Sequence, residues 1–233
     1  MQSHHQSLAE ETLNIKPRKM EKRSDLRSAI EELSTLPKVE AAPGNLDAAP
    51  IPTKPFPHVC NLILQVLDKI GPTIAVLRQD IHQNIQRLEV LCESNPTKYS
   101  NMIEILKNED SEGNARDSTS CSRAILWLTR SIDFMVVLLQ RLVKDPWQEM
   151  ERAVEESYNV TLKQWHGWVS TAAFKVALKL VPDNETFFTL IKNDQNWDNL
   201  REDMQTLVSL LVPFLEHIHS TMGAYRVDRL KST

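Results

Sequence analysis

Three polar side chains on one predicted helix have the types and spacing of a hydrogen-bonding site. Asp80, Asn84 and Arg87 follow an i, i+4, i+7 pattern, which places them along one edge of a helix beside an apolar face. An anion, an amide and a cation in this order could grip a hydroxyl-rich or amide-bearing group. The alternative is a solvated edge next to a core seam, which is common on surface helices.

A second stripe combines aromatic rings with cations. Arg123, Trp127, Arg130 and Phe134 follow one another at three- and four-residue steps in the predicted helix 119–144. An indole face can stack on the C–H side of a sugar ring, and a guanidinium suits a phosphate or an acidic partner. Alternatively, the tryptophan fills the core and the arginines extend past it toward solvent.

A third group lies in the segment WHGW at 165–168. His166 falls at the edge of an apolar face, where an imidazole needs a hydrogen-bond partner, such as a ligand carbonyl or a group of the core. Trp168 points roughly the other way, in register with Lys175 and Lys179. An indole flanked by ammonium groups is typical of a membrane-interface anchor, unless another helix of the bundle covers it.

The elements that position these residues are predicted to be helices throughout, so the fold class is all-α. Apolar residues recur at three- and four-residue spacings from Pro55 onward, and no alternating run is long enough for a strand. Pro213 should kink the last helix or start a new one. The expected helices lie near 55–70, 72–93, 97–109, 119–144, 147–180, 184–193 and 197–222.

The first 50 residues have a different composition. They are polar, carry mixed charge and end in a Pro, Gly and Ala-rich stretch. We expect residues 1–50 to be a largely disordered extension, with a short helix possible at 24–36, and residues 51–233 to form the folded domain. The basic run at 16–23 could bind an anionic surface, and the alternative is a solvated tail.

Composition excludes several classes of function. With 27 basic and 31 acidic residues the chain has a net charge of −4, which argues against nucleic acid as a partner. The three cysteines are too dispersed for a disulfide scaffold or a metal site, and no glycine-rich loop for a cofactor phosphate occurs. No nucleophile lies in a recognisable motif, so we expect no enzyme. The absence of a secretory signal and of long apolar runs favours a cytoplasmic protein.

Taken in order, the three groups resemble the glycolipid transfer protein family. The match consists of D-x-x-x-N-x-x-[KR] at 80–87, LWLTR at 126–130 and WHGW at 165–168, within about 51–222. The resemblance implies a two-layer, all-α sandwich that encloses lipid chains. It also implies non-enzymatic transfer of a glycosylated sphingolipid, such as glucosylceramide, through peripheral and reversible contact with membranes.

The resemblance also implies a role for each head-group residue. Asp80 would accept a hydrogen bond from the ceramide amide and another from a sugar hydroxyl, and Asn84 and Arg87 would bind the sugar. Trp127 would stack under the sugar ring, and His166 would donate to the ceramide carbonyl.

Farther from the head group, the resemblance implies that Phe134 lines the acyl pocket and that Trp168 helps to dock on the membrane.

Arg123 departs from the glycolipid pattern, because glycolipid binders tend to have an apolar residue at this position and the ceramide-1-phosphate branch has arginine. That branch also tends to have lysine at the place of Asn84 and arginine at that of Trp127. The pattern favours a sugar and keeps two alternatives open, which are ceramide-1-phosphate transfer and a sphingolipid-sensing module whose N-terminal tail binds a protein partner.

Overall fold

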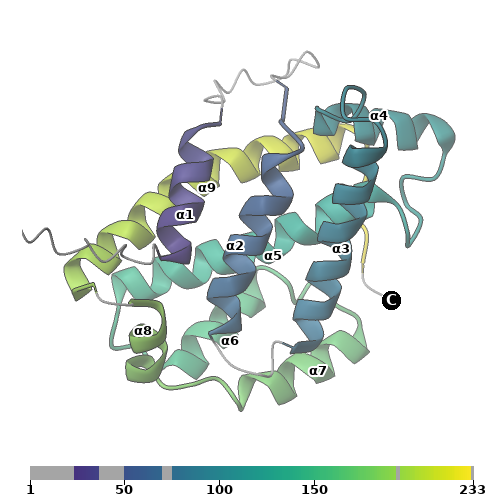
Figure 1. Cartoon of the computed structure of the whole chain (residues 1–233). Coiled ribbons are helices and arrows are strands. Elements are labelled where there is room, and N and C mark those ends of the chain that lie inside the picture. Colours follow the sequence, from purple (N-terminus) through teal and green to yellow (C-terminus); the bar gives the residue numbers. More distant parts are fainter. Residues whose placement is uncertain (1–23, 37–49, 70–74, 193–194, 232–233) are drawn as a thin grey trace, which may run out of the picture.

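The computed structural model describes residues 24–36, 50–69, 75–192 and 195–231, and within these ranges the regular secondary structure is helical, with one isolated bridge between Pro52 and Asn101. This confirms the predicted all-α class. The helices, labelled in Figure 1, are α1 (Asp25–Ser34), α2 (Pro55–Asp68), α3 (Ala75–Ser94), α4 (Met102–Glu112), α5 (Cys121–Lys144), α6 (Met150–Val160), α7 (Trp168–Leu178), α8 (Asn184–Lys192) and α9 (Trp197–Ala224).

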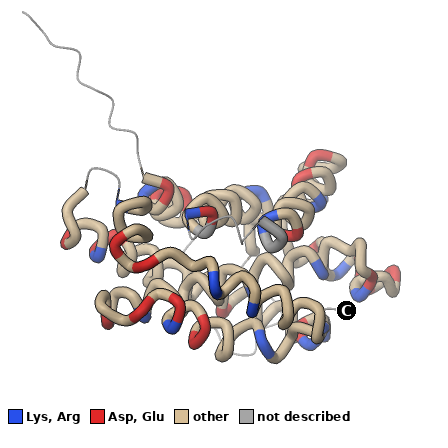
Figure 2. The backbone as a smooth tube through the Cα atoms, turned by 90° about the horizontal axis from the view of Figure 1, so that it is seen from below, with Lys and Arg blue, Asp and Glu red and all other residues tan. Residues whose placement is uncertain are grey.

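The helices form two layers. In one layer α2 contacts both α1 and α3, and in the other α5 contacts both α9 and α6. Across the layers α1 packs on α9, and both α2 and α3 pack on α5. The view in Figure 2 shows the layers one above the other, with basic and acidic residues interspersed along the helices. The expected two-layer helical sandwich is confirmed.

Local sequence explains where several helices begin and end. The side chains of Ser24, Asn101, Ser120 and Asn196 each accept a hydrogen bond from a backbone N–H in the first turn of the helix that follows. Gly113 ends α4 with a φ of 74°, a left-handed conformation that glycine adopts without steric cost. Ser120 in this way sets the first residue of α5, which carries Arg123 and Trp127.

The prediction of one helix over 147–180 is wrong. The chain leaves the helix after Val160, passes through turns and enters a new helix at Trp168, with Gly167 in an extended conformation as its N-cap. The apolar spacing continues across this break, so hydrophobic periodicity alone did not reveal it. As a consequence, α6 and α7 can point in different directions, and His166 lies in the connection between them.

Of the two alternatives at Pro213, a kink or the start of a new helix, the second is wrong, because α9 runs from Trp197 to Ala224 as one helix. Pro213 is exposed, so the backbone carbonyl that loses its hydrogen bond faces solvent. The neighbouring Leu211, Phe214 and Leu215 are buried and hold the helix against the core.

The folded unit includes residues ahead of the expected boundary at 51. The short helix expected at 24–36 is present as α1, and Leu26, Ala29 and Leu33 are buried in the core. An ion pair of 2.8 Å between Arg27 Nε and Asp203 Oδ2 joins α1 to α9. Placing 24–36 in a disordered extension is therefore wrong, since three apolar residues on one face are enough to dock it. Residues 1–23, with the basic run, and 37–49 lie outside the described residues.

Candidate functional site

A cavity of about 740 Å³ lies between α3, α5, α6 and α7. Its size falls within the range of about 300–1,000 Å³ that is usual for small-molecule sites. Polar residues of α3 and of the first turns of α5 line one part of it, and apolar residues of α5, α6 and α7 line another. The lining brings together every residue that the sequence analysis assigned to the head-group site or the acyl pocket, namely Asp80, Asn84, Arg87, Arg123, Trp127, Phe134 and His166.

Asn84 and Arg87 are held in place by a hydrogen bond between them and by the N-terminal end of α5. Asn84 is buried, with 6% of its surface exposed, and its Oδ1 accepts a hydrogen bond of 3.3 Å from Arg87. The same Arg87 nitrogen lies 3.4 Å from the carbonyl oxygen of Ser120, the N-cap of α5. These bonds leave further N–H groups of both side chains available to a ligand in the cavity.

The Asp80 carboxylate opens into the same cavity. Within the described part of the chain it accepts no hydrogen bond. Desolvation by the surrounding protein raises its pKa, against the opposing effect of the Arg87 and Arg123 guanidinium groups. Asp80 remains exposed, and a carboxylate that accepts no hydrogen bond from the described residues is well suited to accept hydrogen bonds from a ligand.

Trp127 is supported from behind by a buried arginine. The guanidinium carbon of Arg130 lies 4.9 Å from the ring centroid of Trp127 and 3.9 Å from that of Trp165, within cation–π range of both. Arg130 donates hydrogen bonds of 2.6 and 2.7 Å to the carbonyl oxygens of Asp228 and Leu230. Burial lowers the pKa of Arg130 to about 10, so it stays cationic at neutral pH.

Arg130 is the residue that the sequence analysis did not assign. One of the two alternatives for this stripe had Arg130 extend past Trp127 toward solvent, whereas only 3% of its surface is exposed. The LWLTR motif was the available signal, since it contains both Trp127 and Arg130. In the structure Arg130 fixes the indole of Trp127 and ties it to the C-terminal segment.

His166 is held as a neutral imidazole. Its Nδ1 lies 3.2 Å from the hydroxyl of Tyr158, and its ring centroid lies 5.8 Å from that of Trp127. Desolvation, and secondarily the charge of Arg130, lower its pKa. Tyr158 in turn stacks on Phe174, with ring centroids 3.5 Å apart and planes 8° apart, which connects α6 to α7.

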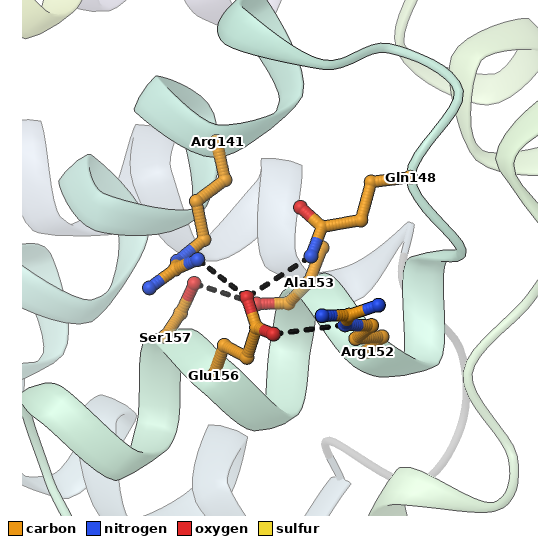
Figure 3. A network of polar contacts seen from close by, with 6 residues as sticks. All are labelled: Arg141, Gln148, Arg152, Ala153, Glu156 and Ser157. Carbon is orange, nitrogen blue, oxygen red and sulfur yellow. Dashed lines mark hydrogen bonds and ion pairs between the residues drawn. The ribbon is translucent and has the colours of Figure 1, made fainter.

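A polar network fixes α6, and with it Tyr158, against α5 (Figure 3). Glu156 of α6 pairs with Arg141 of α5 and accepts hydrogen bonds from Gln148 at 3.0 Å and Arg152 at 2.9 Å. These bonds, that of Arg152 above all, lower the pKa of Glu156. Glu156 lies two residues before Tyr158 on α6. By holding α6 against α5, the network therefore fixes the position of Tyr158, the hydrogen-bond partner of His166.

The α7 helix is apolar in composition, yet none of its residues is buried. Val169 and Val176 are more than half exposed and line the cavity. Trp168 is 84% exposed, and Lys175 and Lys179 are exposed as well. The apolar face of α7 is therefore open toward the cavity that it lines.

Trp147 is a further exposed indole, with 93% of its surface accessible, and it was not singled out from the sequence. It lies in the turn between α5 and α6. The Asn184 amide nitrogen donates to the carbonyl oxygens of Pro146 and Gln148, at 2.9 and 2.6 Å, and so fixes the turn to the start of α8.

The described residues contain no cluster of three or more His, Cys, Asp or Glu side chains that could hold a metal ion. Of the helices described, none combines the length and apolar character that crossing a bilayer requires.

Comparison with known proteins agrees with this geometry. The model of the glycolipid transfer protein family matches residues 51–193. Glycolipid transfer protein 3 of Arabidopsis thaliana is 53% identical over 220 residues, which cover 92% of this chain and 94% of the relative. Glycolipid transfer protein 1 of the same plant is 36% identical over 181 residues, or 78% of this chain and 88% of that one.

Solved structures share the fold. A structure that concerns how FAPP2 selects simple glycosphingolipids with the GLTP fold matches with a TM-score of 0.74 and 26% identity, over 90% of this chain and 98% of that one. Mouse ceramide-1-phosphate transfer protein matches with a TM-score of 0.78 and 16% identity, over 89% and 100%. From the family model and the Arabidopsis relatives it follows that this chain belongs to the glycolipid transfer protein family.

Proposed function

We propose that this protein carries a glycosylated sphingolipid, such as glucosylceramide, between membranes without chemical change. The observation that carries the proposal is one cavity that joins a hydrogen-bonding cluster to an apolar wall. The names of the Arabidopsis relatives support it, because they are glycolipid transfer proteins. The cavity offers a ligand hydrogen bonds and apolar contacts, which can form and break as the ligand binds and leaves. Transfer therefore needs no covalent step.

In this proposal the sugar and the ceramide amide bind at the polar part of the cavity. The free oxygens of Asp80 accept from the amide N–H and a sugar hydroxyl, while Asn84 and Arg87 offer N–H groups to the other hydroxyls. The indole of Trp127, with Arg130 behind it, provides a flat surface for the sugar ring. A lipid without these hydroxyl groups would leave the buried polar groups unpaired, which disfavours its binding.

His166 and the apolar wall bind the ceramide. The hydroxyl of Tyr158 lies 3.2 Å from Nδ1 of His166 and 3.4 Å from Oγ1 of Thr171, and it has one proton to donate. When that proton goes to Nδ1, the neutral ring carries its own proton on Nε2 and can donate to the ceramide carbonyl. Phe134 lies 11 residues beyond Arg123 on α5, a rise of about 16 Å, and lines the cavity with the apolar residues of α7.

Energetics favour an enclosed carrier that loads at a membrane surface. Each buried CH₂ group contributes about 0.8 kcal/mol, so a ceramide with two long chains leaves the bilayer only for another apolar environment. We place the docking surface at Trp168, Lys175 and Lys179, because an exposed indole and ammonium groups suit the interface between head groups and acyl chains. Trp147 would extend this surface.

Ceramide-1-phosphate is a second candidate cargo, and Arg123 is the observation that favours it. Its guanidinium lines the cavity together with Arg87, and two guanidinium groups suit a phosphate. Trp127 speaks for the sugar, because a phosphate makes no use of an aromatic platform.

The test is transfer of labelled glucosylceramide from donor to acceptor vesicles. We expect Trp127→Ala and Asp80→Val each to abolish transfer while the helical circular dichroism stays that of the wild type. Glu89→Val is the matched control, since Glu89 is an exposed carboxylate on the same helix α3 and does not line the cavity. Wild-type transfer by either site variant would refute the site.

A further inference from the structure

The charged side chains that line the cavity do not balance. They are Asp80, Arg87 and Arg123, two guanidinium groups against one carboxylate. Arg130, which stands behind Trp127, is compensated inside the protein, because Asp133 and Asp228 are near enough to raise its pKa. The surplus of one positive charge therefore belongs to the cavity itself.

Arg123 carries this surplus. It is half-buried, and within the described part of the chain its guanidinium makes one hydrogen bond, of 3.1 Å, to the carbonyl oxygen of Lys231. No carboxylate of the described residues lies within ion-pair distance of it. A guanidinium has five N–H donors, so most of those of Arg123 remain for a ligand. Asp80 lies near enough for both Arg87 and Arg123 to lower its pKa, but one carboxylate cannot balance two guanidinium groups, so an anionic ligand would complete the charge balance of the cavity.

The cation and the aromatic platform belong to the same part of α5. Trp127 follows Arg123 by four residues, a rise of about 6 Å along one face of the helix. A neutral sugar on ceramide would use the indole and leave Arg123 without an anion. A simple phosphate would use Arg123 and leave the indole without a ring. A head group that contains both a phosphate and a ring uses both residues.

The magnitude of the charge distinguishes between phosphate types. A phosphate monoester carries a charge of about −1.5 to −2 at pH 7, whereas a diester, with one acidic oxygen left, carries one negative charge. The diester matches the single surplus charge of Asp80, Arg87 and Arg123. It also provides the ester bond that attaches a ring beyond the phosphate.

We infer that the preferred cargo is a ceramide whose phosphate is esterified to a sugar or a cyclitol. In that complex Arg123 and Arg87 bind the phosphate and Trp127 stacks under the ring. This inference rests on the proposed function and narrows its substrate class, and it makes Arg123 the residue that sets selectivity.

The experiment compares three probes in the same vesicle transfer assay: glucosylceramide, ceramide-1-phosphate and inositol phosphorylceramide, at equal mole fraction. We expect the wild-type protein to transfer inositol phosphorylceramide fastest. In Arg123→Leu the ratio of inositol phosphorylceramide to glucosylceramide transfer should fall about tenfold, the loss expected for a charge-assisted hydrogen bond. Arg123→Lys keeps the positive charge but lacks the planar, paired N–H donors of a guanidinium, so it should recover part of this ratio.

Each outcome has a separate meaning. Glucosylceramide or ceramide-1-phosphate transferred fastest, or a ratio unchanged in Arg123→Leu, overturns the inference. Transfer of glucosylceramide alone leaves the proposed function standing, and failure to transfer any of the three probes removes both. If Arg123→Leu does not fold, native mass spectrometry of the wild-type protein with an equimolar mixture of the probes decides, and a bound phosphodiester lipid is the expected result.

Discussion

The guanidinium of Arg130 lies 4.9 Å from the ring of Trp127 and donates to the backbone of Asp228, 98 residues farther along the chain. The position of the indole therefore depends on the C-terminal segment as well as on α5. The hydrogen bonds go to the backbone carbonyl oxygens of Asp228 and Leu230, which residues of any type could provide.

Arg130→Leu should destabilise the fold by about 2–4 kcal/mol, because two carbonyl oxygens lose charge-assisted hydrogen bonds and both indoles lose a cation. Urea unfolding would measure this loss, and near-ultraviolet circular dichroism would report the freed tryptophan rings. Arg201→Leu is the control, since Arg201 is exposed on α9 and should change stability by less than about 0.5 kcal/mol. Equal stability of the two variants would contradict the role of Arg130 as a support for Trp127.

Asp80→Asn should stabilise the empty protein while it weakens glycolipid binding. The pKa of Asp80 is raised by desolvation, so ionised Asp80 costs stability above the pKa of the folded state, and this cost disappears as the pH falls toward the ordinary value of 3.8. The melting temperature of the variant should exceed that of the wild type at pH 7, and the difference should shrink toward pH 4. A variant less stable than the wild type at pH 7 would show that Asp80 has partners inside the protein.

Sequence periodicity predicts most of this fold because most helices bury one continuous apolar stripe. Ile81, Ile85 and Leu88 follow the helical spacing i, i+4, i+7 beside the polar stripe of α3, and all three are buried. Periodicity fails between Val160 and Trp168, where the apolar spacing continues through a non-helical connection. The break depends on backbone conformation at Gly167, which the spacing of side chains does not encode.

Residue types and spacing in the sequence identified the residues that line the cavity, but they did not identify the residues that support them. The seven cavity-lining residues named from the sequence all line one cavity, because motifs on α3, α5 and the α6–α7 connection meet there. The supports depend on contacts between distant segments, such as the bonds from Arg130 to Asp228 and Leu230. No local pattern predicts a contact across that many residues.

Removing residues 1–23 should leave the fold intact, whereas removing residues 1–36 should destabilise it. The longer deletion takes away α1, with the buried Leu26 and Leu33 and the ion pair from Arg27 to Asp203. Loss of two buried leucines costs about 4 kcal/mol or more, since each Leu→Ala change in a core costs about 2–5 kcal/mol. Thermal melting of the two truncated proteins would measure this, and equal melting temperatures would show that α1 contributes nothing to stability.

The same pair of proteins tests whether a protein partner binds through the tail. The 1–23 deletion keeps the cavity, so it should transfer glucosylceramide at the wild-type rate. If a protein partner binds the tail, the deletion should abolish binding of that partner.

The α7 helix should be the least stable wall of the cavity and the one that lipid stabilises most. It buries none of its residues, and its firmest contact with the rest of the fold is the stack of Phe174 on Tyr158. Few buried apolar contacts mean a low free energy of local opening. In hydrogen exchange, amides of α7 should exchange at least about tenfold faster than those of α5, which is buried along most of its length. Vesicles that contain glucosylceramide should slow α7 far more than α9, because the lipid chains would cover Val169 and Val176. Protection of α7 equal to that of α5 without lipid would show that some other wall of the cavity opens for loading.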